Sequence, residues 1–386
     1  MKIVFIIIDG LPDEPSNGKT PLSEAYTPNL DFFAENGVTG ELFLLPEDLP
    51  VWSHFADVAL LGFNPKKYYL KRGPLEALAA DIELTGDFLA IRCNFATIDE
   101  EGRIIDRRAG RAEYGLDKLA ECIEKMNFPL KFIFKRTYGH RAVLIFKEKL
   151  SDKISSNDPL ETGKKPLPIK PLDKDKLSEF TAKIVNQFVA QAFNLLEMHP
   201  INLERTNLGY LPANYLLLRG AGNRVERLPD FGKRWNKKCV CISEPGVTKA
   251  VCMLAGFDAI TVKKENIKGI VEKIFDCLSI YDFVLAHIKG PDEPAHDGDF
   301  ERKKKIIEKI DEELTPFRKF DGILVITSDH ITSTIHKKHM HGPVPVLVYG
   351  KGKDEVKKFD EISVKKGKLK NFDGKKLWEY VMKNEG

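Results

Sequence analysis

The sequence predicts an α/β protein, in which a mixed, mostly parallel sheet flanked by helices carries a smaller inserted α+β domain. At both ends of the chain, short apolar runs alternate with helical patterns, as they do where helices join parallel strands. Between residues 69 and 235, apolar runs are instead separated by turns. Because 386 residues are enough for two cores, we expect a discontinuous core domain (1–68 and 236–386) and an inserted domain (69–235).

The composition is that of a globular protein with nearly balanced charge. The chain has 60 basic and 57 acidic residues and a net charge of +3, so charge gives no reason to expect a nucleic-acid or membrane partner. No apolar run is long enough to span a bilayer. The six cysteines show no CxxC spacing and are expected to be reduced thiols, which favours the cytoplasm.

The first predicted strand, residues 2–8, ends at Asp9. It is a continuous β-branched and aromatic run, which is typical of a buried parallel strand. Its length and the lack of a small-residue cleavage site favour a strand over a signal peptide. Ligands of open α/β sheets bind at the carboxyl ends of the strands, so Asp9 is a candidate ligand-binding residue. Capping of a turn is the alternative role.

Two helices are predicted in the next segment. Thr27 is a suitable N-cap before Pro28, and Gly37 ends that helix. Ser53 stands where the second helix begins. The free N–H groups and the dipole of a helix N-terminus attract anions, so Ser53 could face an anionic ligand. A serine that only caps the helix is the simpler alternative.

The inserted domain is predicted from strand patterns at 87–95 and 131–135 and from helical patterns at 115–125 and 177–199. Arginines stand beside glycines in three of its segments, which are 106–111, 139–141 and 219–224. Such guanidinium groups are well suited to bind small anions. A solvated basic surface is the alternative for each segment.

The parallel α/β pattern resumes after residue 237. The expected strands are 240–242, 260–262, 282–288, 322–326 and 344–349. The expected helices are 247–256, 267–278, 299–318 and 373–383.

Carboxylates and imidazoles gather at the ends of these strands. The strand at 322–326 leads to Asp329 and His330, and six of the nine histidines lie between His287 and His341. Asp292 and His296 are four residues apart, so a helical turn would point both the same way. The donors exceed what one tetrahedral ion uses and suit two divalent ions, Mn²⁺, Mg²⁺ or Zn²⁺. They are Asp9, Ser53, Asp292, His296, Asp329, His330 and His339. We expect His287, His336 and His341 to lie outside this set.

Short motifs run in order along almost the whole chain, at 7–10, 20–30, 94–97, 106–111, 139–143, 157–159, 199–202, 214–222, 292–296 and 329–330. Together they resemble the archaeal-type cofactor-independent (2,3-bisphosphoglycerate-independent) phosphoglycerate mutases of the alkaline phosphatase superfamily. The resemblance implies an alkaline-phosphatase-like core and the interconversion of 3-phosphoglycerate and 2-phosphoglycerate in the cytoplasm. It implies two divalent ions, with Mn²⁺ favoured, and no 2,3-bisphosphoglycerate. We expect a monomer or a small homo-oligomer.

The resemblance also implies residue roles. Ser53 matches the serine that carries the phosphoryl group. Asp9, Ser53, Asp329 and His330 match the ligands of one metal, and Asp292, His296 and His339 match those of the other. The insertion resembles the phosphotransferase half, which implies that substrate is held by Asp106, Arg107, Arg111, His140, Arg141, Asp158 and Arg219. Lys249 of the core resembles a lysine that faces the phosphate.

The chain departs from the family pattern around the serine. The family usually has an acid directly after the serine and a histidine four residues after it, whereas this chain has His54 and Asp57. These positions are one helical turn apart, so the exchange could keep the pair in reversed order. Alternatively, Trp52 and Phe55 add bulk that could mark a related phosphatase or phosphotransferase with another acceptor, such as a homoserine-kinase-like enzyme or a sugar phosphate mutase.

Overall fold

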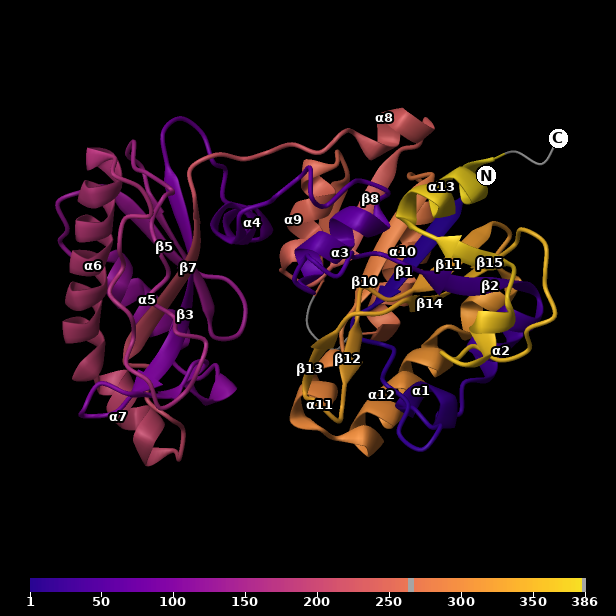
Figure 1. The fold of residues 1–386 in the computed structure, drawn as a ribbon, viewed down its shortest axis with the longest axis horizontal. Coiled ribbons are helices and arrows are strands. Elements are labelled where there is room, and N and C mark those ends of the chain that lie inside the picture. The colour runs from indigo at the N-terminus through magenta and orange to yellow at the C-terminus, as the bar shows by residue number, and fades with distance from the viewer. Residues whose placement is uncertain (263–266, 384–386) are drawn as a thin grey trace. The chain divides into compact units, whose positions relative to one another are not determined.

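The computed structural model describes residues 1–262 and 267–383. Its chain forms two compact units (Figure 1). The first unit combines residues 1–69 with residues 227–386, and the second consists of residues 70–226. Each unit has its own hydrophobic core.

The first unit is built on an eight-stranded sheet in the order β15-β2-β14-β11-β1-β10-β8-β9. The central strands β11, β1, β10, β8 and β9 are parallel, and β14 and β2 pair antiparallel. This confirms the predicted mixed, mostly parallel α/β fold. The strand bounds are β1 Ile3–Ile8, β2 Gly37–Leu42, β8 Cys239–Ser243, β9 Asp258–Thr261, β10 Phe283–Ile288, β11 Ile323–Thr327, β14 Val344–Tyr349 and β15 Leu369–Phe372.

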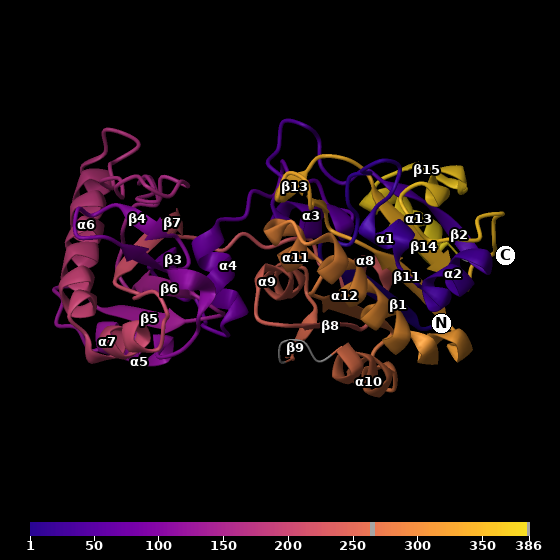
Figure 2. The same ribbon diagram turned by 90° about the horizontal axis from the view of Figure 1, so that it is seen from below.

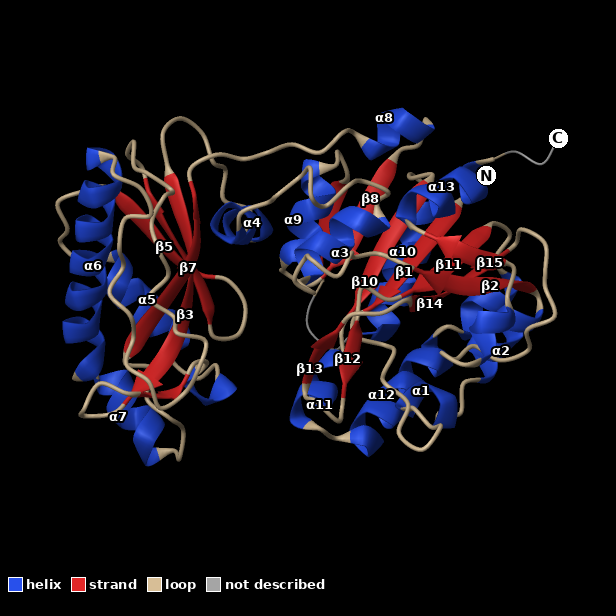
Figure 3. Cartoon of the chain, viewed as in Figure 1, coloured by secondary structure: helices blue, strands red, loops and turns tan. Residues whose placement is uncertain are grey.

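Helices cover both faces of this sheet (Figure 3). Val4, Ile6 and Ile8 of β1 pack in one core cluster with residues of α2, α10 and α12. On the other face, Phe5 packs edge-on against Trp378 of α13 at 4.9 Å, and the Trp378 indole N–H donates to Leu60 O of α3. The helix bounds are α1 Pro21–Glu24, α2 Pro28–Glu35, α3 Ser53–Leu60, α8 Phe231–Trp235, α9 Val247–Leu254, α10 Ile267–Leu278, α11 Asp292–Asp297, α12 Phe300–Glu313 and α13 Gly374–Met382. The chain also forms the 3₁₀ turns η2 Thr315–Lys319 and η3 Ser363–Lys366 and a small hairpin of β12 Ile331–Ser333 and β13 Lys338–Met340.

The structure corrects two details of the predicted helices. Thr27 stands at the N-cap of α2, but its side chain makes no capping bond; the carboxylate of Asp311 accepts from the backbone N–H groups of Asn29 and Leu30 instead. The helix predicted at 299–318 ends at Glu313 and continues only as a 3₁₀ turn, because Pro316 lacks an N–H group for an α-helical bond.

The second unit is an antiparallel sheet in the order β4-β3-β6-β5, with β7 also paired to β3. Figure 2 shows the long helix α6 beside this sheet. Residues of α5 and α6 form a core with alternate residues of β3, and Ala77 of α4 packs with Ala90 on the other face. The bounds are α4 Arg72–Ala79, β3 Leu89–Ile98, β4 Ile104–Asp106, η1 Ala109–Arg111, α5 Leu116–Glu124, β5 Phe132–Arg136, β6 Arg141–Phe146, α6 Lys176–Glu197, α7 Pro200–Asn207 and β7 Tyr215–Gly222.

Candidate metal centre and active site

Asp9 and Asp329 lie close together because they follow neighbouring parallel strands. Ile7 of β1 pairs with Thr327 of β11, and each aspartate stands two residues further on. Asp329 Oδ1 accepts from the N–H groups of Gly10 (3.2 Å) and His330 (3.0 Å). Gly10 has a φ of +63°, and a Cβ there would come within 2.9 Å of Asp292 Cα. A side chain at position 10 would therefore displace the residues around the site.

Asp292, His296 and His339 form a second group of possible metal-ligand atoms, beside the pair Asp9 and Asp329. Asp292 and His296 lie one turn apart on α11, as their spacing predicted, and His339 comes from β13. His339 Nε2 is 3.3 Å and His296 Nε2 is 3.6 Å from Asp292 Oδ1. The two imidazole Nε2 atoms are 3.1 Å apart.

The outer hydrogen bonds of these two histidines indicate that both Nε2 atoms carry lone pairs. His296 Nδ1 contacts Lys337 O at 2.9 Å, and His339 Nδ1 contacts Val51 O at 3.0 Å. A carbonyl oxygen only accepts, so each Nδ1 must donate its proton, and in a neutral ring Nε2 is then the acceptor. Two lone pairs facing each other beside a carboxylate need a cation between them. The donor set therefore fits a divalent metal ion.

Thr332 joins the two groups of donors and was not found from the sequence. Its hydroxyl donates to Asp292 Oδ1 at 2.8 Å and therefore accepts from His330 Nδ1 at 3.0 Å. With a proton on Nδ1, His330 turns Nε2 toward Asp329 Oδ2 at 3.0 Å and Asp9 Oδ1 at 3.6 Å. Thr332 thus sets the tautomer of one candidate ligand and the orientation of another.

Ser53 is the first residue of α3 and faces His330. Its Oγ is 3.4 Å from His330 Nε2. The N-cap position is occupied by Trp52, so Ser53 does not act as the cap of this helix. Its place in the first turn puts its hydroxyl near the positive end of the helix dipole. The structure therefore brings all seven of the predicted donors into one site.

The carboxylates make this site strongly attractive to cations. Burial, together with the charges of Asp329 and Asp292, raises the pKa of Asp9 well above its ordinary value. Burial alone would lower the pKa of His330, but the neighbouring carboxylates, Asp329 first, raise it to about 10. The shift of His330 shows how strongly this group of acids favours a positive charge at its centre.

The other three C-terminal histidines differ in their surroundings. His336 and His341 are exposed, and His336 lies 3.6 Å from Glu14. His287 is buried on β10, where burial lowers its pKa to about 4, and it forms a third group of possible metal ligands with Asp9 and Asp329. His287 therefore lies beside the predicted donors, and the expectation that all three histidines are outside the ligand set stays a prediction.

Positive charge gathers on one face of the second unit's sheet. Arg92 of β3 pairs with Arg219 of β7, and Asn94 pairs with Arg141 of β6. Because side chains alternate along a strand, these residues share the face that carries Ala90 and α4. Arg107 forms a bidentate ion pair with Asp158 at 2.9 and 2.7 Å. Asp106 accepts from the Arg108 N–H group, and Arg111 is exposed at the end of η1.

Mutual repulsion in this cluster indicates a site for an anion. Burial and the neighbouring arginines, Arg141 first, lower the pKa of His140 to about 2. Burial and the charges of other arginines also lower the pKa of Arg92 and Arg219. The buried Glu76 offsets part of this charge: its carboxylate is 3.9 Å from Arg92 and accepts from Thr137 Oγ1 at 2.6 Å. Arg92 was not predicted from the sequence, although the alternation of side chains along β3 could have revealed it.

The segment around Ser53 keeps its departure from the family pattern. His54 and Asp57 are both buried in α3, and Asp57 Oδ2 accepts from Thr248 Oγ1 of α9 at 3.0 Å. Lys249, the next residue of α9, is also buried. The Trp52 ring stacks on Phe55 with centroids 5.7 Å apart. Asp57 is therefore hydrogen-bonded to the helix that carries Lys249, and the aromatic rings of Trp52 and Phe55 lie beside Ser53.

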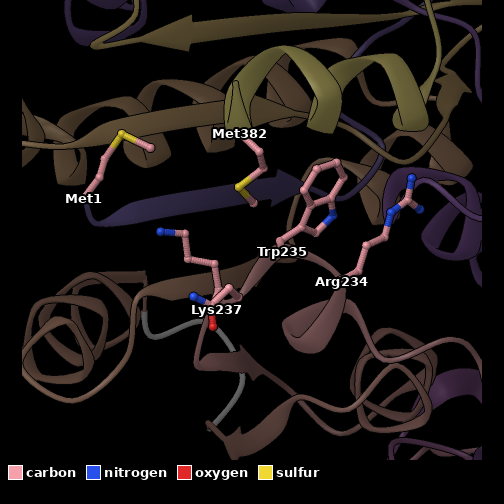
Figure 4. A pocket seen from close by; sticks show the side chains of 6 residues that line it. Met1, Arg234, Trp235, Lys237 and Met382 are labelled. Atoms are coloured by element: carbon pink, nitrogen blue, oxygen red, sulfur yellow. The ribbon is translucent and has the colours of Figure 1, made fainter. Parts of the chain in front are cut away.

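A surface pocket elsewhere in the first unit does not belong to this site (Figure 4). It lies where β1 begins, whereas the site lies where β1 ends. Its lining residues are Met1, Arg234, Trp235, Asn236, Lys237 and Met382.

An α/β core that gathers carboxylates, imidazoles and a serine hydroxyl at the carboxyl edge of its sheet is typical of metal-dependent phosphoryl-transfer enzymes.

No helix in the described part of the chain is long and apolar enough to cross a membrane.

Comparison with known proteins is more specific. Residues 34–202 match the family model of 2,3-bisphosphoglycerate-independent phosphoglycerate mutase. The chain is 40% identical to 2,3-bisphosphoglycerate-independent phosphoglycerate mutase 1 from Archaeoglobus fulgidus, over 98% of this chain and 96% of the relative. It is 39% identical to the corresponding protein from Methanocaldococcus jannaschii, with coverage of 99% and 96%. The chain therefore belongs to the 2,3-bisphosphoglycerate-independent phosphoglycerate mutase family.

Two solved structures share the fold. A protein from Pyrococcus horikoshii superimposes with a TM-score of 0.82 at 30% identity, over 99% of this chain and 96% of that one. The cofactor-independent phosphoglycerate mutase from Thermoplasma acidophilum superimposes with a TM-score of 0.64 at 33% identity, over 99% of both chains. Both the α/β fold class and the resemblance found in the sequence are confirmed.

Replacement of Thr332 by valine should weaken metal binding about 10- to 100-fold, because it removes the hydroxyl that orients His330 and Asp292. Thr334→Val, two residues further on, is the matched control, since among the described residues its backbone N–H donates to Asp13 and its hydroxyl has no hydrogen bond. Titration with Mn²⁺ followed by calorimetry checks this. Equal affinities in the two variants would contradict the bridging role.

Proposed function

We propose that the protein interconverts 3-phosphoglycerate and 2-phosphoglycerate through a phosphoserine on Ser53. The observation that carries the proposal is the serine hydroxyl, 3.4 Å from His330 Nε2, at the edge of a sheet where two groups of metal donors meet. Family membership supports the choice of substrate, because the relatives bear the name phosphoglycerate mutase.

In the first step, Ser53 Oγ attacks the phosphorus of 3-phosphoglycerate, and the bond from phosphorus to the oxygen on C3 breaks. The serine proton leaves and the C3 oxygen gains a proton, so the products are phosphoserine and glycerate. In the second step, the 2-hydroxyl oxygen of glycerate attacks the phosphorus and loses its proton, the bond from phosphorus to Ser53 Oγ breaks, and Oγ gains a proton to regenerate Ser53. The glycerate must stay bound between the steps, because water in its place would make the enzyme a phosphatase.

The residues divide these tasks between the two units. We assign substrate binding to Asp106, Arg107, Arg111, His140, Arg141, Asp158 and Arg219 of the second unit, and a phosphate contact to Lys249 of the first. Guanidinium groups match the carboxylate and phosphate of the substrate, and their mutual repulsion favours an anionic ligand. The neutral imidazole of His140 can donate to or accept from a substrate hydroxyl.

Two divalent ions would neutralise the phosphoryl oxygens and lower the pKa of the attacking hydroxyl. We assign Asp9, Ser53, Asp329 and His330 to one ion and Asp292, His296 and His339 to the other. Mixed carboxylate and imidazole donors without a thiolate favour Mn²⁺ over softer metals. No 2,3-bisphosphoglycerate is needed in this scheme, because the phosphoryl group returns to the glycerate it came from. We place the enzyme in the cytoplasm as a monomer or a small homo-oligomer.

A coupled assay tests the proposal. The protein is incubated with Mn²⁺ and 3-phosphoglycerate, and 2-phosphoglycerate is followed through enolase while inorganic phosphate is measured in parallel. We expect steady formation of 2-phosphoglycerate with little phosphate. Phosphate release without 2-phosphoglycerate would instead support a phosphatase or a phosphotransferase with another acceptor. The observation that favours this alternative function is the stacked pair of large aromatic rings, Trp52 and Phe55, beside Ser53.

A further inference from the structure

His287 is a buried imidazole that the proposed mechanism does not use. Its side chain is on the central strand β10, and the residue is 3% exposed. Its Nε2 atom has no hydrogen-bond partner among the described residues. Asp329 Oδ2 is also buried, and His330 Nε2 lies 3.0 Å from it. Burial of the His287 Nε2 atom without a partner is costly unless a ligand satisfies it.

The register of the sheet explains why His287 lies at the site. Ile7 of β1 pairs with His287 on one side and with Thr327 on the other. Asp9 and Asp329 are each two residues beyond this row, and side chains two apart along a strand share a face. His287 therefore lies on the strand next to that of Asp9, two residues back from the level of the carboxylates and on the same face of the sheet. One ligand atom from each of the three residues lies within 4.8 Å of the others.

The positions of His287, Asp9 and Asp329 favour a shared metal ion over direct hydrogen bonds between the three side chains. His287 Nε2 makes no hydrogen bond to either carboxylate in the described structure, so the three side chains do not satisfy one another. Two ligand atoms that are each about 2.0–2.2 Å from one ion lie at most about 4.4 Å apart, so three atoms within 4.8 Å of one another could share an ion after a small adjustment. We propose that His287 is an additional ligand of the divalent ion held by Asp9 and Asp329. The inference rests on the metal centre of the proposed function and adds a nitrogen donor to it.

The balance of charge at the site favours His287 as an additional ligand of one of the two ions over His287 as part of a site for a third ion. The carboxylates of Asp9, Asp292 and Asp329 supply three negative charges. Two divalent ions already exceed that negative charge, and a third would add repulsion without a new anion. An imidazole adds a donor with no charge.

The proposal predicts a change in metal preference. Imidazole nitrogen suits Mn²⁺, Co²⁺ and Zn²⁺ better than Mg²⁺, which prefers oxygen. His287→Gln should therefore weaken Co²⁺ or Mn²⁺ binding at one of two sites about 10- to 100-fold and change Mg²⁺ binding less. His336→Gln, an exposed histidine of the same region, is the matched control. His339→Ala is the reference for loss of the other site.

Metal binding is measured by calorimetry and by the visible absorption of the Co²⁺ form, without any assay of activity. In the wild-type protein, nitrogen hyperfine couplings of bound Mn²⁺, with ¹⁵N-histidine labelling, count the bound imidazoles independently of whether His287→Gln folds. We expect four, from His287, His296, His330 and His339. Three imidazoles, or an unchanged Co²⁺ spectrum in folded His287→Gln, would overturn the proposal. A third bound ion that is lost in His287→Gln would also overturn it, in favour of a separate site.

The controls separate this inference from the proposed function. A wild-type protein that binds no divalent ion would refute the metal centre itself, and the role of His287 with it. A wild-type protein with two ions and three imidazoles would refute only the role of His287.

Discussion

Ser53→Ala should lower the mutase activity at least about 10⁴-fold, because it removes the hydroxyl that would carry the phosphoryl group. Within the described part of the chain, the side chain of Ser53 has a single polar contact, to His330 at 3.4 Å, so the fold should tolerate the change. Unfolding free energy is expected to change by less than about 0.5 kcal/mol. Enolase-coupled assay of the variant measures the first effect, and thermal unfolding measures the second.

Two further measurements make the result specific to the nucleophile. Intact-mass analysis after rapid quenching with 3-phosphoglycerate should detect a phosphorylated wild-type chain and an unmodified variant. Ser363→Ala, in a 3₁₀ turn of the same unit, should keep full activity. Mutase turnover by Ser53→Ala, or a phosphorylated Ser53→Ala chain, would assign the nucleophile elsewhere.

The parts of the site that could be predicted are those that depend on local pattern. A buried apolar run followed by an aspartate places Asp9 and Asp329 at strand ends, and parallel pairing then brings the ends together. The spacing of Asp292 and His296 specifies one face of a helical turn. Their roles as metal ligands rest on the family resemblance and remain predictions for the titrations described above.

The parts that could not be predicted depend on distant segments. The hairpin that carries Thr332 has strands of only three residues, too short for a periodic pattern. His287 lies inside a continuous apolar strand, and only the sheet register reveals that it faces Asp9. Asp311 replaces Thr27 as the cap of α2 from nearly three hundred residues away in the chain. In each case the partner is set by tertiary packing.

Lys303 is another residue whose role depends on such packing. Its side chain and that of its partner Asp13 are both 0% exposed, and Nζ lies 3.0 Å from Asp13 Oδ2. The ammonium group also donates to Pro12 O at 3.1 Å and to Thr332 O at 2.8 Å. Its three protons are therefore all used. Burial lowers the pKa of Lys303, while the carboxylate of Asp13 opposes that shift.

Lys303→Met should destabilise the first unit by about 3–5 kcal/mol, because it leaves the Asp13 carboxylate buried without its cation. Asp13 Oδ1 also accepts from the Thr334 N–H group, so the hairpin that carries His339 should loosen as well. Thermal unfolding and hydrogen exchange of residues 331–340 measure the two effects. Lys305→Met, exposed on the same helix, is the control and should change little.

The double variant Lys303→Met with Asp13→Asn tests whether the buried charge is the cause. The asparagine keeps an acceptor for Thr334 N–H but carries no charge, so the double variant should be more stable than Lys303→Met alone. If the double variant is instead as unstable as the sum of the two single variants, packing of the lysine stem accounts for the loss. In that event the link between α12 and the hairpin would depend on shape, and metal affinity should survive in Lys303→Met.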